Sequence, residues 1–360
     1  MGRFYNVNGK QMYGEHITRT VSATGAWAAG AALSDLAIDR DFIVTNIRIT
    51  AAMAVTLAAT AVSDAPKRAL QTLQIVGDSK TFLSLTGGVV GSQLGRMLAF
   101  INKFDNECAG LAATVDVGST SVTQVYNFHP GHFKRNRFDL SVIIPARALS
   151  NLVARIGCPA AAAMDSGANI TAGTYTITVD GVSGIPITKD MYYPGAYVNC
   201  YPHTAITGVN GHTENVPTGG YVRRLFLLTD DNTAVTALRS DAQVTNVQLK
   251  LSKESTDLIN QSFVDLKAAN AFKFGVFGDD QPAILGAIAT TRPGFNGTAA
   301  MPLGFACVDF RDYFDPILGL NMINAQEGDA KVNMTIAVAT GQTALYWDIV
   351  YPMDPMWVGK

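Results

Sequence analysis

Two stretches of the chain, separated by about half its length, follow the same order of elements. Thr72–Phe104 and Thr245–Phe274 each read as an alternating strand, a short polar turn with Ser-Lys, a second short strand and a helical stretch. Each follows a β-rich segment and precedes further strands. A repeat this long indicates two copies of one β domain, because solenoid repeats have periods of roughly 20–50 residues. This arrangement favours a building block for assembly over an enzyme.

The low charge content constrains how the surface is used. Charged residues make up 16% of the 360 residues and hydrophobic residues 48%, whereas a typical soluble domain has roughly 25% charged residues. So low a fraction of charged residues indicates that part of the surface is buried against other subunits. The net charge of −2 provides no strong basic field for nucleic acid.

The residue types favour strands and turns. The chain has 24 Asp but 5 Glu, together with 33 Gly; Asp favours turns, whereas Glu favours helices. Many short strands separated by turns, without a strand–helix–strand rhythm, predict an all-β fold of sandwiches or barrels.

Two short helices are predicted within this β framework, at Ser92–Phe104 and Gln261–Ala271. In the first, apolar residues recur with helical spacing and Ser92 is placed to cap the start. Its apolar positions are Leu94, Met97, Leu98, Ile101 and Phe104.

The sequence divides into five parts. Residues 1–20 read as a polar arm, and the connection 185–219, which holds four prolines, contains the natural linker between two halves at residues 186–215. We therefore expect one β domain at 21–185, a second at 216–352, and a tail at 353–360.

Several segments resemble one known family, the double jelly-roll major capsid proteins of tailless icosahedral viruses, many of which enclose a membrane. Phe138–Ile156 (FDLSVIIPARALSNLVARI) is similar to that family's proline-terminated strand and short helical step. Val216–Leu228 (VPTGGYVRRLFLL) looks like the entry into the first strand of a second roll. The resemblance implies two tandem jelly-roll β-sandwiches with short inserted helices, and three chains forming a trimer with a near-hexagonal outline.

The resemblance also implies partners and a location. The expected partners are further copies of the chain, first in a homotrimer and then in a lattice, with penton or minor capsid proteins and internal membrane lipid. Sequence-specific nucleic acid is not expected. The expected location is the virion capsid, after synthesis in the host cytoplasm, because the N-terminal residues lack the apolar core of a signal peptide.

Other functions remain as alternatives. A hydrolase of the peptide-N-glycanase type also pairs two jelly rolls, but an export signal and convergent acidic residues would be expected. A carbohydrate-binding β-sandwich protein would use Trp27, Trp347 and Trp357 for sugar stacking. A capsid protein with a long spine helix is disfavoured by the scarcity of long helices.

No catalytic, metal or cofactor site is predicted. His129 and His132 form an H-x-x-H pair, but Pro130 and Gly131 place it in a turn without a third ligand. Asp230-Asp231 is interpreted as a solvated loop tip. The four cysteines contain no CxxC pair and are expected to be free thiols.

The two ends are the candidate functional segments. We expect both to lie outside the sandwich cores as contact arms that bind neighbouring subunits or anionic membrane lipid, because exposed aromatic residues usually mark an interface. The residues expected to make these contacts are Arg3, Phe4, Tyr5, Lys10, Tyr13 and Trp357.

Overall fold

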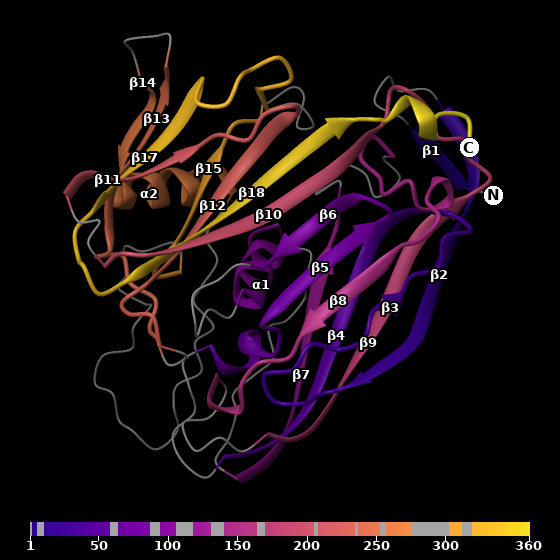
Figure 1. Cartoon of the computed structure of the whole chain (residues 1–360), viewed down its shortest axis with the longest axis horizontal. Coiled ribbons are helices and arrows are strands. Elements are labelled where there is room, and N and C mark those ends of the chain that lie inside the picture. The colour runs from indigo at the N-terminus through magenta and orange to yellow at the C-terminus, as the bar shows by residue number, and fades with distance from the viewer. Residues whose placement is uncertain are drawn as a thin grey trace.

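The fold is described from a computed structural model of the 360-residue chain. Figure 1 shows two β-sandwiches side by side. The structure describes residues 2–5, 11–57, 64–86, 94–105, 118–130, 140–163, 170–204, 208–234, 237–252, 257–274, 302–311 and 319–360. The predicted all-β fold with short helices is confirmed.

The first sandwich consists of eight strands in two sheets. Numbered one to eight along the chain, they pair in the orders one-eight-three-six and two-seven-four-five, which is the topology of a jelly roll. The strands are β2 (Gln11–Ala26), β3 (Leu36–Ala37), β4 (Ile43–Leu57), β5 (Thr72–Gly77), β6 (Lys80–Leu85), β7 (Gly118–Phe128), β8 (Val153–Gly157) and β9 (Ile170–Ser183).

The second sandwich repeats this topology. Its sheets have the orders β10-β18-β12-β15 and β11-β17-β13-β14, which are again one-eight-three-six and two-seven-four-five. The strands are β10 (Tyr192–Pro202), β11 (Gly208–Asn215), β12 (Tyr221–Asp230), β13 (Val244–Leu251), β14 (Asp257–Ser262), β15 (Phe305–Asp309), β17 (Ala330–Ile336) and β18 (Gln342–Pro352), and the two-residue β16 (Leu320–Asn321) pairs with β12. We refer to the two sandwiches as the first and second roll.

The predicted linker is wrong, because residues 186–215 contain the first two strands of the second roll. β10 pairs with β18 along its whole length and, in parallel, with β6 of the first roll at Ala196 and Tyr197. One sheet of each roll therefore joins the other edge to edge, and together they form one nine-stranded sheet. β10 tolerates Pro194 and Pro202 because neither residue pairs with β6. The missing backbone N–H groups therefore cost no hydrogen bond to β6. Tyr221–Leu228 is correspondingly the third strand of its roll, not the first.

The predicted N-terminal arm is also wrong in its extent. β1 (Gly2–Tyr5) pairs with Gln11–Gly14 in a hairpin, but from Glu15 onward β2 pairs with β9 of the first roll. The segment looks polar because Glu15, His16, Thr18 and Arg19 are exposed, whereas the half-buried Ile17 packs against the core. The first roll therefore begins near residue 15, not residue 21.

The repeat of strand, turn, strand and helix is confirmed. β5 and β6 precede α1 (Gly95–Phe104), and β13 and β14 precede α2 (Phe263–Phe274). Each helix thus lies between the fifth and sixth strands of its roll. Ser92 lies outside the described residues, whereas Ser262 caps α2 by accepting a hydrogen bond from the Asp265 backbone amide at 3.1 Å. In the described part of the chain, no helix has the length and hydrophobicity needed to cross a membrane.

The cores explain why β12 is buried along nearly its whole length. Leu225 and Leu227 face the core of the second roll, while Phe226 and Leu228 belong to the core around α1 of the first. Side chains alternate across a strand, so a strand covered on both faces is apolar throughout. The second roll thus completes the core of the first.

Candidate functional site

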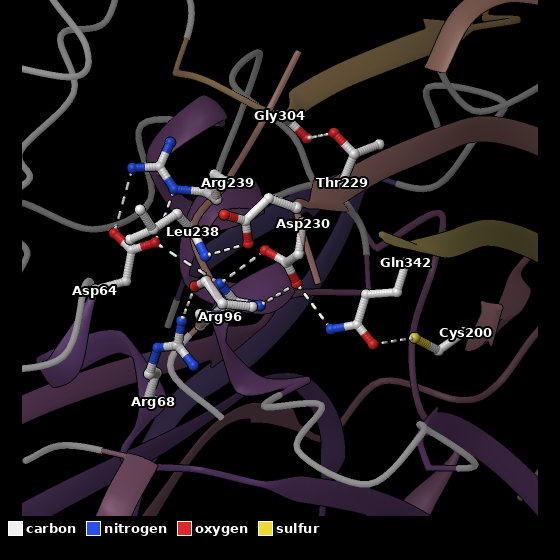
Figure 2. Close-up of polar contacts among 12 residues, drawn as sticks. Asp64, Arg68, Arg96, Cys200, Thr229, Asp230, Leu238, Arg239, Gly304 and Gln342 are labelled. Atoms are coloured by element: carbon white, nitrogen blue, oxygen red, sulfur yellow. Dashed lines mark hydrogen bonds and ion pairs between the residues drawn. The ribbon is translucent and has the colours of Figure 1, made fainter. Parts of the chain in front are cut away.

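Among the residues that the structure describes, most buried charged side chains lie at the junction between the two rolls. On the first roll it is formed by α1 and the 3-10 turn Ala65–Arg68; on the second it is formed by β12, β15 and β18. Figure 2 shows part of it, with side chains from both rolls pointing toward one another. Two charge networks and an aromatic cluster make up this junction.

The first network is centred on two buried aspartates. Asp64 accepts a hydrogen bond from Arg239 Nε at 2.7 Å, and Lys67 Nζ donates to it at 3.4 Å. Asp230 accepts hydrogen bonds from both terminal nitrogens of Arg96, at 3.1 and 2.6 Å. Because Asp64 and Arg96 belong to the first roll and Asp230 and Arg239 to the second, each aspartate binds an arginine across the junction. Both pairs are visible in Figure 2.

The charges in this network change the acidity of its members. Burial alone would raise the pKa of Asp64, but the positive charges of Arg239, Lys67 and Arg96 outweigh it and hold the pKa well below its usual value. Burial, reinforced by the charge of Arg96, lowers the pKa of Arg68 to about 9. Asp64 is therefore ionised and Arg68 protonated at neutral pH.

We expect Asp64→Asn to change the acid limb of the stability profile. A carboxylate whose pKa is lower in the folded state contributes stability above its unfolded pKa, about 3.9, and loses it as the pH falls toward the folded value. The difference in unfolding free energy between wild type and variant should therefore be largest near pH 7 and shrink below about pH 4. Urea unfolding at a series of pH values measures it; a difference independent of pH contradicts the assignment.

The second network joins α1 to the opposite sheet of the junction. Asp105, at the end of α1, accepts a hydrogen bond from Arg224 Nη1 at 2.6 Å. Asp348 of β18 accepts hydrogen bonds from Arg224 Nε at 2.9 Å and from Arg223 Nε at 3.0 Å. Arg223 also donates to the backbone oxygen of Pro130 at 2.9 Å. Both arginines and Asp348 are fully buried.

A backbone irregularity allows two consecutive arginines to bind one aspartate. Neighbouring residues of a regular strand point to opposite faces. The register of β12 against β18 shifts between Val222 and Arg224, which is a β-bulge. A bulge re-aims a side chain in this way, so Arg223 and Arg224 both reach Asp348.

An aromatic cluster fills the space between the networks. Phe100 and Phe104 of α1 contact Phe305 of β15 with ring centroids 5.5 and 6.0 Å apart. Phe104 also meets Phe226 of β12 edge-on at 5.5 Å. The Arg239 guanidinium lies 4.7 Å from the Phe100 ring centroid. The junction is thus a packed core with charge pairs at its margins, and its role in the chain is structural.

Of the residues predicted to form contact arms, the structure describes the side chains of Tyr13 and Trp357. Tyr13 is 55% exposed, and its role as a contact residue stays a prediction. Trp357 is 7% exposed and packs against Tyr193 at 5.2 Å, so the expectation that it lies outside the core is wrong. The tail is held there because Gly359 donates to the backbone oxygen of Ile187. Arg3, Phe4 and Tyr5 belong to β1, whose side chains are not described, and Lys10 lies outside the described residues.

The candidate metal ligands give no site within the described residues. His132 and the basic run 134–137 lie outside them. In the part of the chain that is described, no group of three or more His, Cys, Asp or Glu side chains is placed to hold a metal ion. Asp230, interpreted as part of a solvated loop tip, is instead buried in the first network.

Sequence reasoning missed the charged residues of the junction, although a signal was present. Arg223 and Arg224 interrupt an otherwise apolar strand, YVRRLFLL, and Asp348 interrupts another, ALYWDIV. Charged residues in strands that are buried on both faces require partners, because an unpaired buried charge costs several kcal/mol, roughly 3–5. Opposite charges in two such strands indicate a pair.

Comparison at the level of sequence finds no relative: no protein-family model and no curated protein matches the chain. Comparison of structures does find matches. The chain superimposes on the major capsid protein of Sulfolobus turreted icosahedral virus with a TM-score of 0.67 and 17% identity, covering 94% of this chain and 98% of that one.

Two further matches have lower identity but similar coverage. The PBCV-1 virus capsid gives a TM-score of 0.58 at 9% identity, covering 95% of each chain. The major capsid protein of bacteriophage PM2 gives 0.53 at 10% identity, covering 95% of this chain and 99% of that one. The chain therefore has the double jelly-roll fold of these proteins along nearly its whole length.

Proposed function

We propose that this double jelly-roll chain is the major capsid protein of an icosahedral virus and that its function is to assemble with copies of itself. One observation carries the proposal: two rolls of identical strand order are fused through one sheet, and the fold of known capsid proteins extends over 94% of the chain. A chain that supplies two similar rolls lets three copies present six similar units to a lattice.

The proposal includes partners and a location. Three chains form a trimer with a near-hexagonal outline, and trimers then form the shell together with penton or minor capsid proteins. The shell is the site of function, and the chain is made in the host cytoplasm. The low charge content supports self-assembly, because obligate interfaces bury roughly 2,000–5,000 Å² of largely apolar surface.

Light scattering and negative-stain microscopy of the purified protein test the proposal. We expect trimers at micromolar concentration and particles with a hexagonal outline or shells. A stable monomer at these concentrations, with no assembly in the native particle, contradicts it. A hydrolase or a carbohydrate-binding protein would give dispersed molecules instead.

The N-terminal hairpin is proposed to act in shell assembly or membrane attachment rather than in the roll. Residues 2–5 pair with residues 11–14, and pairing with β9 begins at Glu15. Met12 and Gly14 pack against the first roll, so the deletion is confined to residues 2–10. It should leave folded trimers but impair shell formation or flotation with anionic vesicles. Loss of folding on deletion would place the hairpin in the core instead.

A further inference from the structure

The outer face of α2 carries an exposed apolar stripe. Phe272 is 96% exposed, Val264 is 66% exposed, and Ala268 between them is also exposed. These residues are four apart, so they form one line on the helix. The opposite face is buried in the second roll through Phe263 and Leu266. α2 is therefore apolar on two faces, of which the described residues bury one.

An identical anchor in both rolls fixes how α2 corresponds to α1. The Asn102 side chain of α1 donates a hydrogen bond to the backbone oxygen of Asn127 in β7 at 2.7 Å. It also accepts one from the backbone amide of Asn127 at 2.8 Å. Asn270 of α2 makes the same two bonds with the backbone of Cys307 in β15, both at 2.7 Å. Asn102 thus corresponds to Asn270, and Asn127 to Cys307.

By this correspondence, the exposed stripe of α2 occupies positions that are buried in α1. Counting from the anchors, Val264, Ala268 and Phe272 correspond to Arg96, Phe100 and Phe104. Phe104 is 2% exposed, although Phe272 is almost fully exposed. The three residues of α1 are those that contact the second roll, through Asp230, Phe305 and Phe226. The stripe of α2 therefore occupies the position that contacts the next roll.

The same anchors identify the surface that would cover α2. Cys307 pairs with Phe226, and Asn127 pairs with Arg48. Phe226, Asp230 and Phe305, which cover α1, therefore correspond to Arg48, Ala52 and Val125 of the first roll. Their side chains point away from the core of that roll, since Ile47, Ile49 and Met53 point into it. The matching surface is the outer face of β4 and β7.

We propose that the stripe Val264–Ala268–Phe272 of one copy packs on the outer face of β4 and β7 in the first roll of a second copy. The inference rests on the proposed self-assembly and specifies the surfaces that perform it. The contact repeats, between chains, the junction that joins the two rolls within a chain. It uses two different surfaces, so it is heterologous and generates a ring if the rotation closes.

The paired positions are chemically compatible. The ion pair Arg96–Asp230 is replaced by Val264 against Ala52, which are both apolar. The pair Phe100–Phe305 is replaced by Ala268 against Val125. Phe104 against Phe226 becomes Phe272 against Arg48, whose guanidinium binds Asp180 at 2.8 Å but leaves the side chain 40% exposed. An arginine over a phenylalanine ring is a favourable cation–π contact.

Charge substitutions test the contact directly. Phe272→Asp, Val264→Arg and Ala52→Asp each place a charge in the proposed apolar contact, so each should raise the apparent dissociation constant of the trimer at least tenfold, on the order seen for interface anchors. Leu258→Asp is the matched control: Leu258 is also an exposed apolar residue of the second roll but lies on β14, off the stripe. It should assemble like wild type.

The double variant Val264→Arg/Ala52→Asp recreates the Arg96–Asp230 pair between chains. Its trimer affinity should return to within about threefold of wild type, since the coupling of two contacting residues is measured in this way. Figure 1 shows α2 and the sheet containing β4 and β7 on opposite sides of the molecule, so rescue reports a contact between copies. Analytical ultracentrifugation over a dilution series measures the affinities, and far-UV circular dichroism of the diluted monomers checks the fold.

The outcomes separate this inference from the proposed function. If wild type is monomeric, the proposed function fails. If wild type is trimeric and the single variants remain trimeric, or the double variant is not rescued, trimers use another surface and the inference is overturned. If Phe272→Asp and Val264→Arg instead lower the thermal midpoint of the monomer, the stripe is covered within one chain, residues 275–300 being the adjacent candidate, and the inference is again overturned.

Discussion

Replacement of Asp348 by alanine should destabilise the folded chain by about 3–5 kcal/mol, the cost of breaking a buried ion pair by removing one partner. Asp348 binds Arg223 and Arg224, which are both fully buried. Burial lowers the pKa of Arg223. For Arg224, the negative charges of Asp105 and Asp348 outweigh burial and raise the pKa. Without Asp348, Arg223 and Arg224 both lose the carboxylate that they share.

Urea unfolding at a fixed protein concentration measures this effect, because assembly makes apparent stability depend on concentration. Asp35→Ala is the control. Asp35 also binds an arginine, Arg155, at 3.0 Å, but both side chains are about half exposed. An exposed pair contributes roughly 0–1 kcal/mol. Equal losses for Asp35→Ala and Asp348→Ala would show that the junction admits water.

Phe305→Ala should cost a similar amount, about 3–5 kcal/mol, through the cavity that it leaves. Phe305 is fully buried and its ring meets Phe100, Phe104 and Phe226. Because Phe305 belongs to the second roll and Phe100 to the first, the cavity would weaken the contact between rolls as well as one core. We therefore expect the variant to lose cooperativity, with the two rolls unfolding in separate steps.

Calorimetry together with urea unfolding measures both effects. Phe305→Leu keeps an apolar side chain at this position and should cost less than Phe305→Ala, because the cavity is smaller. Leu258→Ala is the exposed control and should change the unfolding free energy by less than about 0.5 kcal/mol. A single cooperative transition for Phe305→Ala, with a loss no larger than the control, contradicts the view that this ring joins the rolls.

The two rolls were predictable because their signals are local. The strand–turn–strand–helix order at Thr72–Phe104 and Thr245–Phe274 depends on period-two and helical spacing of apolar residues, and it corresponds to β5–β6–α1 and β13–β14–α2. The two helices were located within a few residues. These features follow from burial of one face of each element, which the order of residues determines.

The boundaries of the rolls were not predictable in the same way. β2 exposes several consecutive polar residues and reads as a polar arm, and β10 carries prolines and reads as a linker. Each is identified as a strand by its partners, β9 for β2, and β18 and β6 for β10. Because these partners lie more than a hundred residues away, the pairing cannot be recognised from the pattern of residues within β2 or β10 alone.

The sequence by itself determined the fold class, the duplication and the scarcity of surface charge. Only the tertiary structure decided which charged residues are buried. Asp230 and Asp231 are adjacent, yet Asp230 is buried against Arg96 while Asp231 is not. Likewise Phe104 and Phe272 occupy corresponding positions in two similar helices, and one is buried while the other is exposed. The physical reason is that burial depends on what packs against a residue, and here the covering surface belongs to another roll.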